Sequence, residues 1–134
     1  MIKICGKPKY DVDGETDQIE LLTQGKFYKK NGKYYIIYRE SELTGLNGVT
    51  TTLKLEDNCV TLIRSGMMST QMVFEEGKRH FGLYQTIDGA MTVSISASRV
   101  KNMISDEGGD LFIDYSVEID NLLTAENSLS LNVC

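Results

Sequence analysis

The dipeptide Asn31-Gly32 lies between two runs of aromatic and β-branched residues, 27–28 and 34–38. Asn-Gly in this setting is the strongest short-range signal for a β-hairpin, because the tight turn requires positive φ at both central residues. Further short β-rich runs follow along the chain, separated from one another by Gly, Asp or Asn. The recurrence of strand and turn signals, without strong helical periodicity, predicts an all-β fold.

The pattern predicts about eight to ten antiparallel strands. They are expected near residues 2–6 and 17–29, from residue 34 onward, and over 50–55, 59–63, 71–74, 80–84, 91–103, 111–119 and 129–133. Sequential hairpins build a meander, and a long meander is stabilised by closing into a barrel without exposed edges. We therefore expect a single up-and-down barrel domain over residues 1–134, because this length is too short for two ordinary domains.

The net charge, the apolar runs and the cysteines indicate which kinds of partner and which cellular compartment to expect. The net charge of −5 argues against nucleic acid, and the lysines at 26, 29, 30 and 33 flank a turn, where solvated lysines are usual. No apolar run reaches the roughly 20 residues needed to span a bilayer, so no membrane association is expected. The N-terminus lacks an apolar signal core, and the cysteines at 5, 59 and 134 are odd in number and far apart. These features predict reduced thiols in the cytoplasm.

Two carboxylates fall on the predicted inner face of the barrel. A two-residue turn at 31–32 fixes the hairpin register and gives one apolar face. That face carries Ile19, Leu21, Phe27, Tyr34, Ile36 and Tyr38. Its continuation along the second strand carries Glu40 and Glu42. Buried carboxylates need a cation, donors or water. Either these two glutamates lie at a hydrated rim, or they belong to a polar site at the barrel mouth.

Arg64 is predicted to point inward beside them. A turn at Asp57-Asn58 pairs Thr51 with Arg64, on the same face as Leu53 and Leu62. Arginine forms bidentate hydrogen bonds with carboxylates, and it is favoured for charge pairing in partly dry sites. Arg64 therefore has two interpretations: a purely structural pair with Glu40 or Glu42, or an anchor for a ligand's carboxylate or phosphate.

The third hairpin leaves two registers open. A three-residue loop at 75–77 pairs Phe74 with Lys78 and places Met72, Phe74, His80, Tyr84 and Thr86 on one face. A two-residue loop instead places Phe81 and Leu83 opposite Met72 and Phe74. In the next strand, alternation with Val93, Ile95 and Ala97 predicts that the serines at 94, 96 and 98 face solvent.

The sequence contains no motif of known catalysis. Phosphate loops, dinucleotide-binding glycine patterns and nucleophile elbows are absent, and no His, Cys or Asp cluster predicts a metal site or another cofactor. His80 is the only histidine, and a lone histidine is more often structural than catalytic. Glu40 and Glu42 are two residues apart on one strand, a poor match for a glycosidase pair.

Several segments resemble the YwiB-like family of bacterial proteins. They are 40–48 with Thr51-Thr52, Leu62 to Gly66, Met72 to Phe74, Tyr84 to Thr86, and Phe112 to Tyr115. The resemblance runs from Ile2 to Val133 and implies a calycin, or lipocalin-like, barrel in a bacterial cytoplasm. It implies no reaction or substrate, because the family carries a domain of unknown function.

The leading functional hypothesis is a non-enzymatic barrel that binds a small anionic or amphipathic ligand at one open end. The predicted site consists of Glu40, Glu42, Thr51, Arg64, His80, Tyr84 and Thr86. Arg64 would anchor the charge, and a glutamate would orient it. The alternative is an interaction module with a filled core, in which a homodimer covers Tyr35, Ile37 and Ile63 on the outer face.

Overall fold

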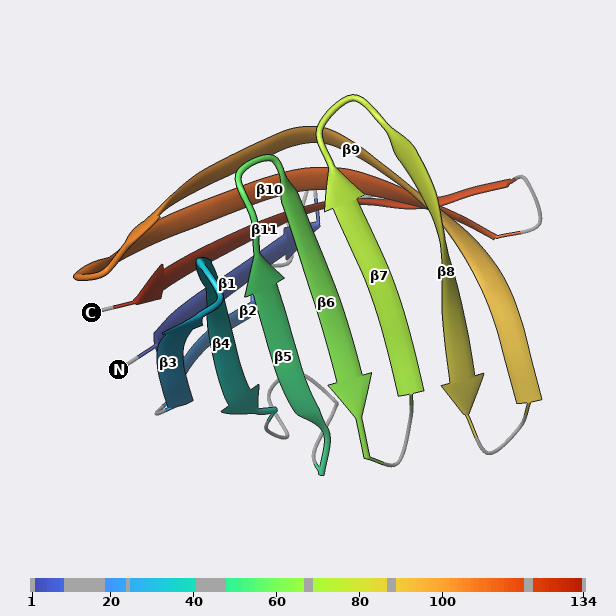
Figure 1. Cartoon of the computed structure of the whole chain (residues 1–134). Helices are drawn as coiled ribbons and strands as arrows, with labels where there is room; N and C mark the ends of the chain where they lie inside the picture. Colours follow the sequence, from blue (N-terminus) through green and yellow to red (C-terminus); the bar gives the residue numbers. More distant parts are fainter. Residues whose placement is uncertain are drawn as a thin grey trace.

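The computed structural model describes residues 2–8, 19–23, 25–40, 48–66, 69–86, 89–119 and 122–133. All regular structure in these ranges is β-strand (Figure 1). The strands are β1 (Ile2–Pro8), β2 (Ile19–Thr23), β3 (Gly25–Lys30), β4 (Lys33–Arg39), β5 (Thr50–Leu55), β6 (Cys59–Ser65), β7 (Ser69–Glu75), β8 (Arg79–Thr86), β9 (Gly89–Ser105), β10 (Gly108–Ile119) and β11 (Leu122–Val133). No helix in the described ranges is long and apolar enough to cross a membrane.

The strands form one antiparallel sheet that closes almost completely into a barrel. The strands from β3 to β11 pair in sequence order, and β11 then pairs with β1, which pairs with β2. The two outermost strands, β2 and β3, are separated in sequence only by residue 24, so the chain itself joins the two edges. The predicted up-and-down barrel is confirmed. The described ranges contain eleven strands because the strand expected over 17–29 is divided into β2 and β3.

The first two hairpins have the predicted registers. Asn31 and Gly32 have φ values of 53° and 78°, the positive values that a two-residue hairpin turn requires. In the β3–β4 ladder, Phe27 lies opposite Ile36. In the β5–β6 ladder, Thr51 lies opposite Arg64. Because side chains alternate between faces, these pairings fix the inward set along four consecutive strands.

The third hairpin differs from both registers considered above. Its ladder pairs Ser69 with Gln85, Thr70 with Tyr84, and Gln71 with Leu83. Extended by one residue toward the turn, this register places Met72 opposite Gly82, whereas the two expected registers placed it opposite His80 or Phe81. At the turn, Gly77 donates its N–H to the carbonyl oxygen of Ala97 on β9, at 2.9 Å. The end of β7 is thereby attached to β9, and the β7–β8 ladder is displaced from a tight hairpin.

Apolar side chains fill the middle of the barrel. One transverse row of inward residues consists of Phe27, Ile36, Leu53, Leu62 and Met72. A second row, nearer the 57–58 turn, contains Tyr34, Leu55, Val60 and Phe74. Ile36, Leu53, Val60 and Phe74 are fully buried. Burial of this apolar area is the main stabilising contribution to the fold.

One end of β3–β8 is covered by the second half of β9 and the turn that follows it. The Asn102 side chain donates to the carbonyl oxygen of Glu56 at 3.1 Å. Beyond β9, the Tyr34 hydroxyl donates to Asp106 at 2.5 Å. The long strands β9 and β10 arch over this end in Figure 1. The opposite end, where β4 leads into β5, carries the polar residues described below.

The prediction that Ser94 faces solvent is wrong. Its side chain is buried, with 6% exposure, because the Arg79 guanidinium covers it. Arg79 donates from Nε to the Ser94 hydroxyl and from Nη2 to Glu118 at 2.8 Å. Ser98 is exposed, as the alternation predicts, and Ser96 is half-buried.

Candidate functional site

A row of polar side chains crosses the inner face of the barrel directly below the apolar rows. Successive ladders place Tyr38 opposite Thr51, Thr51 opposite Arg64, and Arg64 opposite Thr70. We call Tyr38, Thr51, Arg64 and Thr70, together with Glu40, the polar row. Directly opposed residues have Cβ atoms about 5 Å apart, so these side chains are immediate neighbours. The row exists because β4–β7 all pair in register and all change from apolar to polar at the same level.

Glu40 lies one inward position beyond Tyr38, at the end of β4. Its side chain is almost completely buried, and its Oε1 accepts a hydrogen bond of 2.6 Å from the Thr51 hydroxyl. Its backbone N–H donates to the carbonyl oxygen of Val49 at 2.8 Å, which fixes the strand where it leaves the sheet. Glu40 is therefore a positioned carboxylate inside the barrel end, and not a hydrated rim residue.

Arg64 forms an ion pair with Glu40 but no hydrogen bond with it. The Nε atom of Arg64 lies 3.8 Å from Glu40 Oε1, beyond hydrogen-bonding distance. That Nε atom is buried and has no hydrogen-bond partner among the described residues. The Arg64 side chain as a whole keeps 21% exposure, so the guanidinium lies between the interior and the barrel end. The pair with Glu40 therefore leaves Arg64 Nε without a hydrogen bond, and Glu42, the other partner considered for a structural pair, lies outside the described residues.

Thr70 contributes a second unsatisfied group next to Arg64. The residue is 1% exposed, and its hydroxyl has no hydrogen-bond partner within the described part of the chain. A buried hydroxyl without a partner is uncommon, because leaving it unpaired destabilises a protein by roughly 1–3 kcal/mol. Arg64 Nε and the Thr70 hydroxyl, on directly opposed residues, are thus two buried polar groups at this end of the barrel whose hydrogen bonds the described part of the chain does not supply.

The environment of Tyr38 is also polar and dry. Burial raises the pKa of the Tyr38 phenol above its ordinary value, and the negative charge of Glu40 raises that pKa further. The Arg64 charge and a hydrogen bond with Thr51 act in the opposite direction. Tyr38 therefore stays a neutral hydrogen-bonding group at any physiological pH.

The structure places His80 apart from the polar row. His80 pairs with Ile95 on β9, whereas Tyr84 pairs with Met91. Four positions along a strand correspond to about 13 Å, so His80 lies toward the opposite end of the barrel. Its Nε2 forms a 3.0 Å hydrogen bond with Glu75 Oε1. This bond, and a further one from Lys78, lower the pKa of Glu75.

The remaining predicted residues are placed only in part. Thr51 and Arg64 belong to the polar row together with Glu40, as expected. The backbone of Tyr84 continues the row, because it lies opposite Thr70, and Thr86 follows at the end of β8. Their side chains, and the whole of Glu42, lie outside the described residues. Within the described ranges no group of acidic, His and Cys side chains could hold a metal ion.

Sequence reasoning missed Thr70 and assigned Tyr38 to the apolar inner face. The signal for Thr70 was weak, because the turn between β6 and β7 has no two-residue hairpin motif. Its Gly66 has φ of 137°, and a Cβ there would come 2.4 Å from the Gly48 carbonyl oxygen. Gly66 therefore lies where two chain segments approach closely, next to the β6–β7 ladder that opposes Arg64 and Thr70, and the sequence does not show this approach.

Comparisons with known proteins agree with this fold. A family model described as a domain of unknown function, DUF1934, matches residues 2–131. An uncharacterized β-barrel protein of Bacillus subtilis strain 168, YwiB, is 27% identical over 107 residues, which are 80% of this chain and 74% of YwiB. The crystal structure of YwiB from Bacillus subtilis is similar with a TM-score of 0.76 at 21% identity, over 98% of this chain and 88% of that one. The chain therefore belongs to the DUF1934 family.

Proposed function

We propose that this DUF1934 protein binds a small molecule through an anionic group at the end of the barrel that carries the polar row. The proposal rests on two buried donors, Arg64 Nε and the Thr70 hydroxyl, that have no hydrogen-bond partner among the residues the structure describes. A carboxylate or phosphate oxygen between them would accept from both. Charge-assisted hydrogen bonds of this kind are the stronger ones, particularly where water is partly excluded.

Glu40 and Thr51 hold the arginine in place in this proposal. The Thr51 hydroxyl fixes the Glu40 carboxylate at 2.6 Å, and Glu40 attracts the guanidinium from one side at 3.8 Å. Arg64 is thus held near its binding position before the ligand arrives, which lowers the entropy lost on binding. Tyr84 and Thr86 are expected to complete the polar lining, since both follow along β8.

The filled middle of the barrel limits the size of the ligand. Met72 and Leu62, the next inward residues above Thr70 and Arg64, are 2% and 3% exposed. No apolar tail can extend past them without repacking the core. The proposal therefore favours a small anion or a short amphipathic acid. We expect the protein to act in the cytoplasm, and the free thiol of Cys59 is consistent with a reducing compartment.

The experiment is a thermal-shift titration with inorganic phosphate, sulfate and short aliphatic carboxylates, beside native mass spectrometry of the purified protein. A ligand at 100 times its Kd stabilises the folded state by about 2.7 kcal/mol. The expected result is a rise in Tm with at least one of these anions, lost in Arg64→Met and retained in Arg99→Met. Arg99 is exposed on β9, so its replacement makes the same chemical change away from the polar row.

Two results would overturn the proposal. One is that the wild type neither shifts with these anions nor carries an extra mass in its native form. The other is that Arg64→Met and Arg99→Met lose the shift equally. If Arg64→Met does not fold, Thr70→Val supplies the same comparison without removing a charge.

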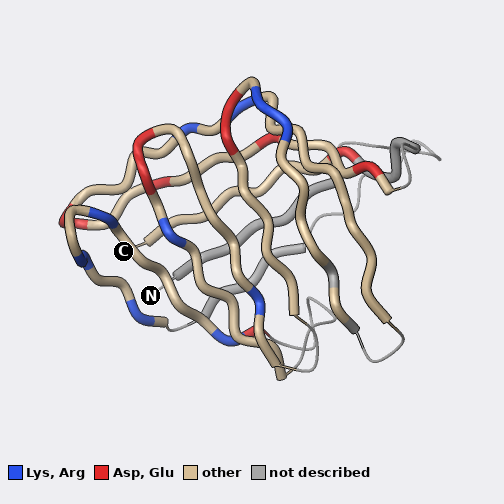
Figure 2. Tube along the Cα trace, turned by 45° about the vertical axis from the view of Figure 1, so that its right-hand side comes forward, with Lys and Arg blue, Asp and Glu red and all other residues tan. Residues whose placement is uncertain are grey.

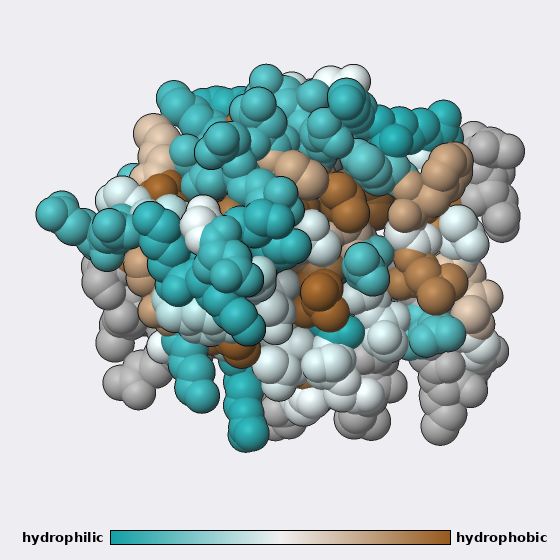
Figure 3. Space-filling model, viewed as in Figure 1, coloured by the Kyte–Doolittle hydropathy of each residue, from teal (hydrophilic) through white to brown (hydrophobic). Residues whose placement is uncertain are grey.

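A second candidate function is self-association through the outer face of β6–β8. Ile63, Phe81 and Leu83 are 40%, 73% and 44% exposed there, and brown atoms gather over these strands in Figure 3. A groove of about 380 Å³ lies between Val73, Phe81 and Leu83. Tyr35 and Ile37, also assigned to this interface from the sequence, are half-buried. A Phe81→Ser variant should lower the dimer fraction in light scattering; a wild type that stays monomeric at high concentration excludes this candidate.

A further inference from the structure

Positive charge is concentrated on three adjacent strands of this acidic protein. The β3, β4 and β5 segments contain Lys26, Lys29, Lys30, Lys33, Arg39 and Lys54 and not one acidic residue. With a net charge of −5 for the whole chain, these segments carry +6 and the remainder carries −11. Figure 2 shows the same separation, with only blue along these strands and red beginning at their ends.

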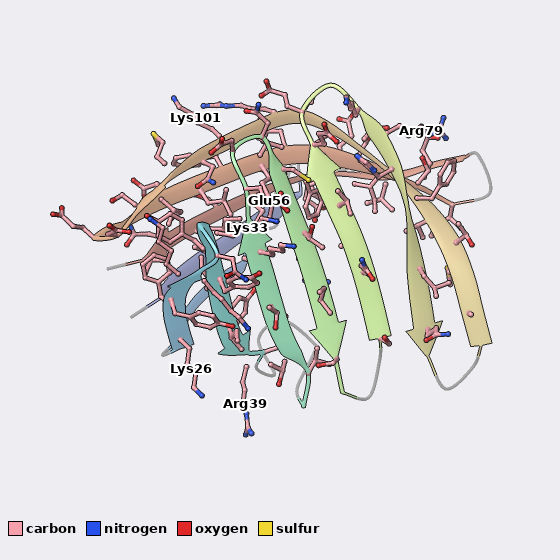
Figure 4. All side chains as sticks on the ribbon, viewed as in Figure 1. Lys26, Lys33, Arg39, Glu56, Arg79 and Lys101 are labelled. Atoms are coloured by element: carbon pink, nitrogen blue, oxygen red, sulfur yellow. The ribbon has the colours of Figure 1, made fainter. Side chains whose placement is uncertain are left out.

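Three of these cations form no ion pair with the part of the chain that the structure describes. Lys33 and Lys54 lie 3.7 and 3.8 Å from Glu56, and Lys29 lies 3.7 Å from Asp106. Lys26, Lys30 and Arg39 have no ion-pair partner among the described residues. All three are exposed, and Figure 4 shows Lys26 and Arg39 extending away from the lower ends of β3 and β4. By strand alternation all three belong to the outer face, opposite the polar row.

An aromatic pair lies between these cations on the same outer face. Tyr28 and Tyr35 are directly opposed in the β3–β4 ladder, and their rings stack with centroids 5.2 Å apart and an angle of 12° between planes. Tyr28 is 41% exposed, a large apolar surface to leave in water. Lys26 and Lys30 flank it on its own strand at the two neighbouring outward positions.

We propose that the outer face of β3–β5 binds single-stranded nucleic acid. Such surfaces combine cations that follow the phosphate backbone with aromatic rings on which the bases stack. The outer face has both: the free cations Lys26, Lys30 and Arg39, and the exposed ring of Tyr28. An acidic peptide would use the cations but would have no need of the stacking ring.

The net charge of −5 for the whole chain argues against nucleic acid as a partner, but net charge does not describe the local charge of one face. A phosphate backbone interacts with the local field of the surface it approaches, and a screening length of about 8 Å at physiological salt hides the acidic remainder. The sequence alone places the lysines around a turn, whereas the β3–β4 ladder places Lys26, Lys30 and Lys33 on the same outer face as Tyr28. The site is also independent of the inner polar row, so Arg64→Met should not affect it.

The test is fluorescence anisotropy with labelled 12-nucleotide oligo-U and oligo-dT, measured between 50 and 200 mM salt. Each phosphate contact contributes about −0.7 to the slope of log K against log salt, so three contacts give about −2.1. The double variant Lys26→Gln/Lys30→Gln should reduce the slope to about −0.7. The matched control is Arg99→Gln/Lys101→Gln, which removes two exposed charges on β9 and should leave the slope unchanged.

Tyr28→Ala separates stacking from simple attraction of polyanions. Loss of one stacked base should weaken oligonucleotide binding by roughly 5- to 150-fold, while binding of inorganic polyphosphate and of a poly-Glu peptide stays as it was. Absence of oligonucleotide binding at 50 mM salt overturns the proposal. So does equal binding of polyphosphate, poly-Glu and oligonucleotide that Tyr28→Ala leaves unchanged. If Tyr28→Ala fails to fold, the lysine pair and its control still decide the matter.

Discussion

Replacement of Thr51 or Thr70, the two threonines on either side of Arg64, by valine should change the free energy of unfolding in opposite directions. Thr51 and Thr70 are 0% and 1% exposed, and each lies directly opposite Arg64, on either side of it. Replacement by valine keeps the β-branched shape at both positions and removes only the hydroxyl. The difference between them is that Thr51 donates to Glu40 at 2.6 Å, whereas the Thr70 hydroxyl has no partner in the described chain.

The expected magnitudes follow from that difference. Thr51→Val loses a hydrogen bond to a charged group and should destabilise the fold by roughly 1.5–3 kcal/mol. Thr70→Val removes an unsatisfied buried hydroxyl and should stabilise the ligand-free protein by about 1–2 kcal/mol. For a chain of this size, about 1 kcal/mol corresponds to a Tm change of about 4 °C. Thr51→Val should therefore unfold earlier and Thr70→Val later than the wild type.

Urea and thermal unfolding, followed by circular dichroism without added anions, measure both effects. The same Thr70→Val protein should bind the anion of the thermal-shift panel more weakly than the wild type. Greater stability together with weaker binding is the expected signature of a residue retained for its ligand. A Thr70→Val variant that is destabilised by more than 1 kcal/mol would show that the hydroxyl is satisfied within the fold, and the site as described would be refuted.

Three further predictions concern single residues. Burial raises the pKa of Tyr38 in the folded state, so above pH 10 the phenol ionises more readily in the unfolded state. The free energy of unfolding of the wild type should therefore fall there by up to about 1.4 kcal/mol per pH unit. Tyr38→Phe should make this dependence weaker in urea titrations. The His80 hydrogen bond lowers the pKa of Glu75, so this carboxylate stabilises the fold above its ordinary pKa, and the contribution is lost as pH falls below about 4. His80→Gln should therefore lose less stability than the wild type between pH 5 and 3. An acid transition identical to that of the wild type would contradict this. Gly82→Ala should destabilise the protein by about 1–3 kcal/mol, since its Cβ would come 2.6 Å from the Gln71 carbonyl oxygen, and a Tm within 2 °C of the wild type would be incompatible with that contact.

Much of the fold could be predicted because the first two hairpins have strong local signals. Asn31-Gly32 and Asp57-Asn58 fix their registers within a few residues, and alternation then assigns the inward faces of β3 to β6. Arg64 and Thr51 could be placed in this way, and so could the apolar rows. These predictions depended only on short-range chemistry, which a sequence displays directly.

The parts that could not be predicted depend on contacts between distant segments. The β7–β8 register is displaced because Gly77 is bound to Ala97, a contact across 20 residues that no local motif signals. Ser94 is buried because Arg79 covers it from the neighbouring strand. His80 was grouped with Tyr84 because both share a face, but alternation gives no information on how far apart two residues lie along a strand. The face of the sheet on which a side chain lies could be predicted from sequence, whereas the end of the barrel at which it lies could not.

Arg64 Nε–H has no hydrogen-bond acceptor within the described part of the chain, and the proposed function requires it to donate to a bound anion. The chain contains four arginines, so the side-chain Nε–H region of a ¹H–¹⁵N spectrum should show at most four signals. The loss of one signal in Arg64→Lys assigns it. On titration with inorganic phosphate, and then with the short carboxylates, the Arg64 signal should move downfield, while that of Arg79, already bonded to Ser94, stays in place. An Arg64 signal that does not move with any of these anions, or that moves together with the other three, would show that Arg64 does not bind them.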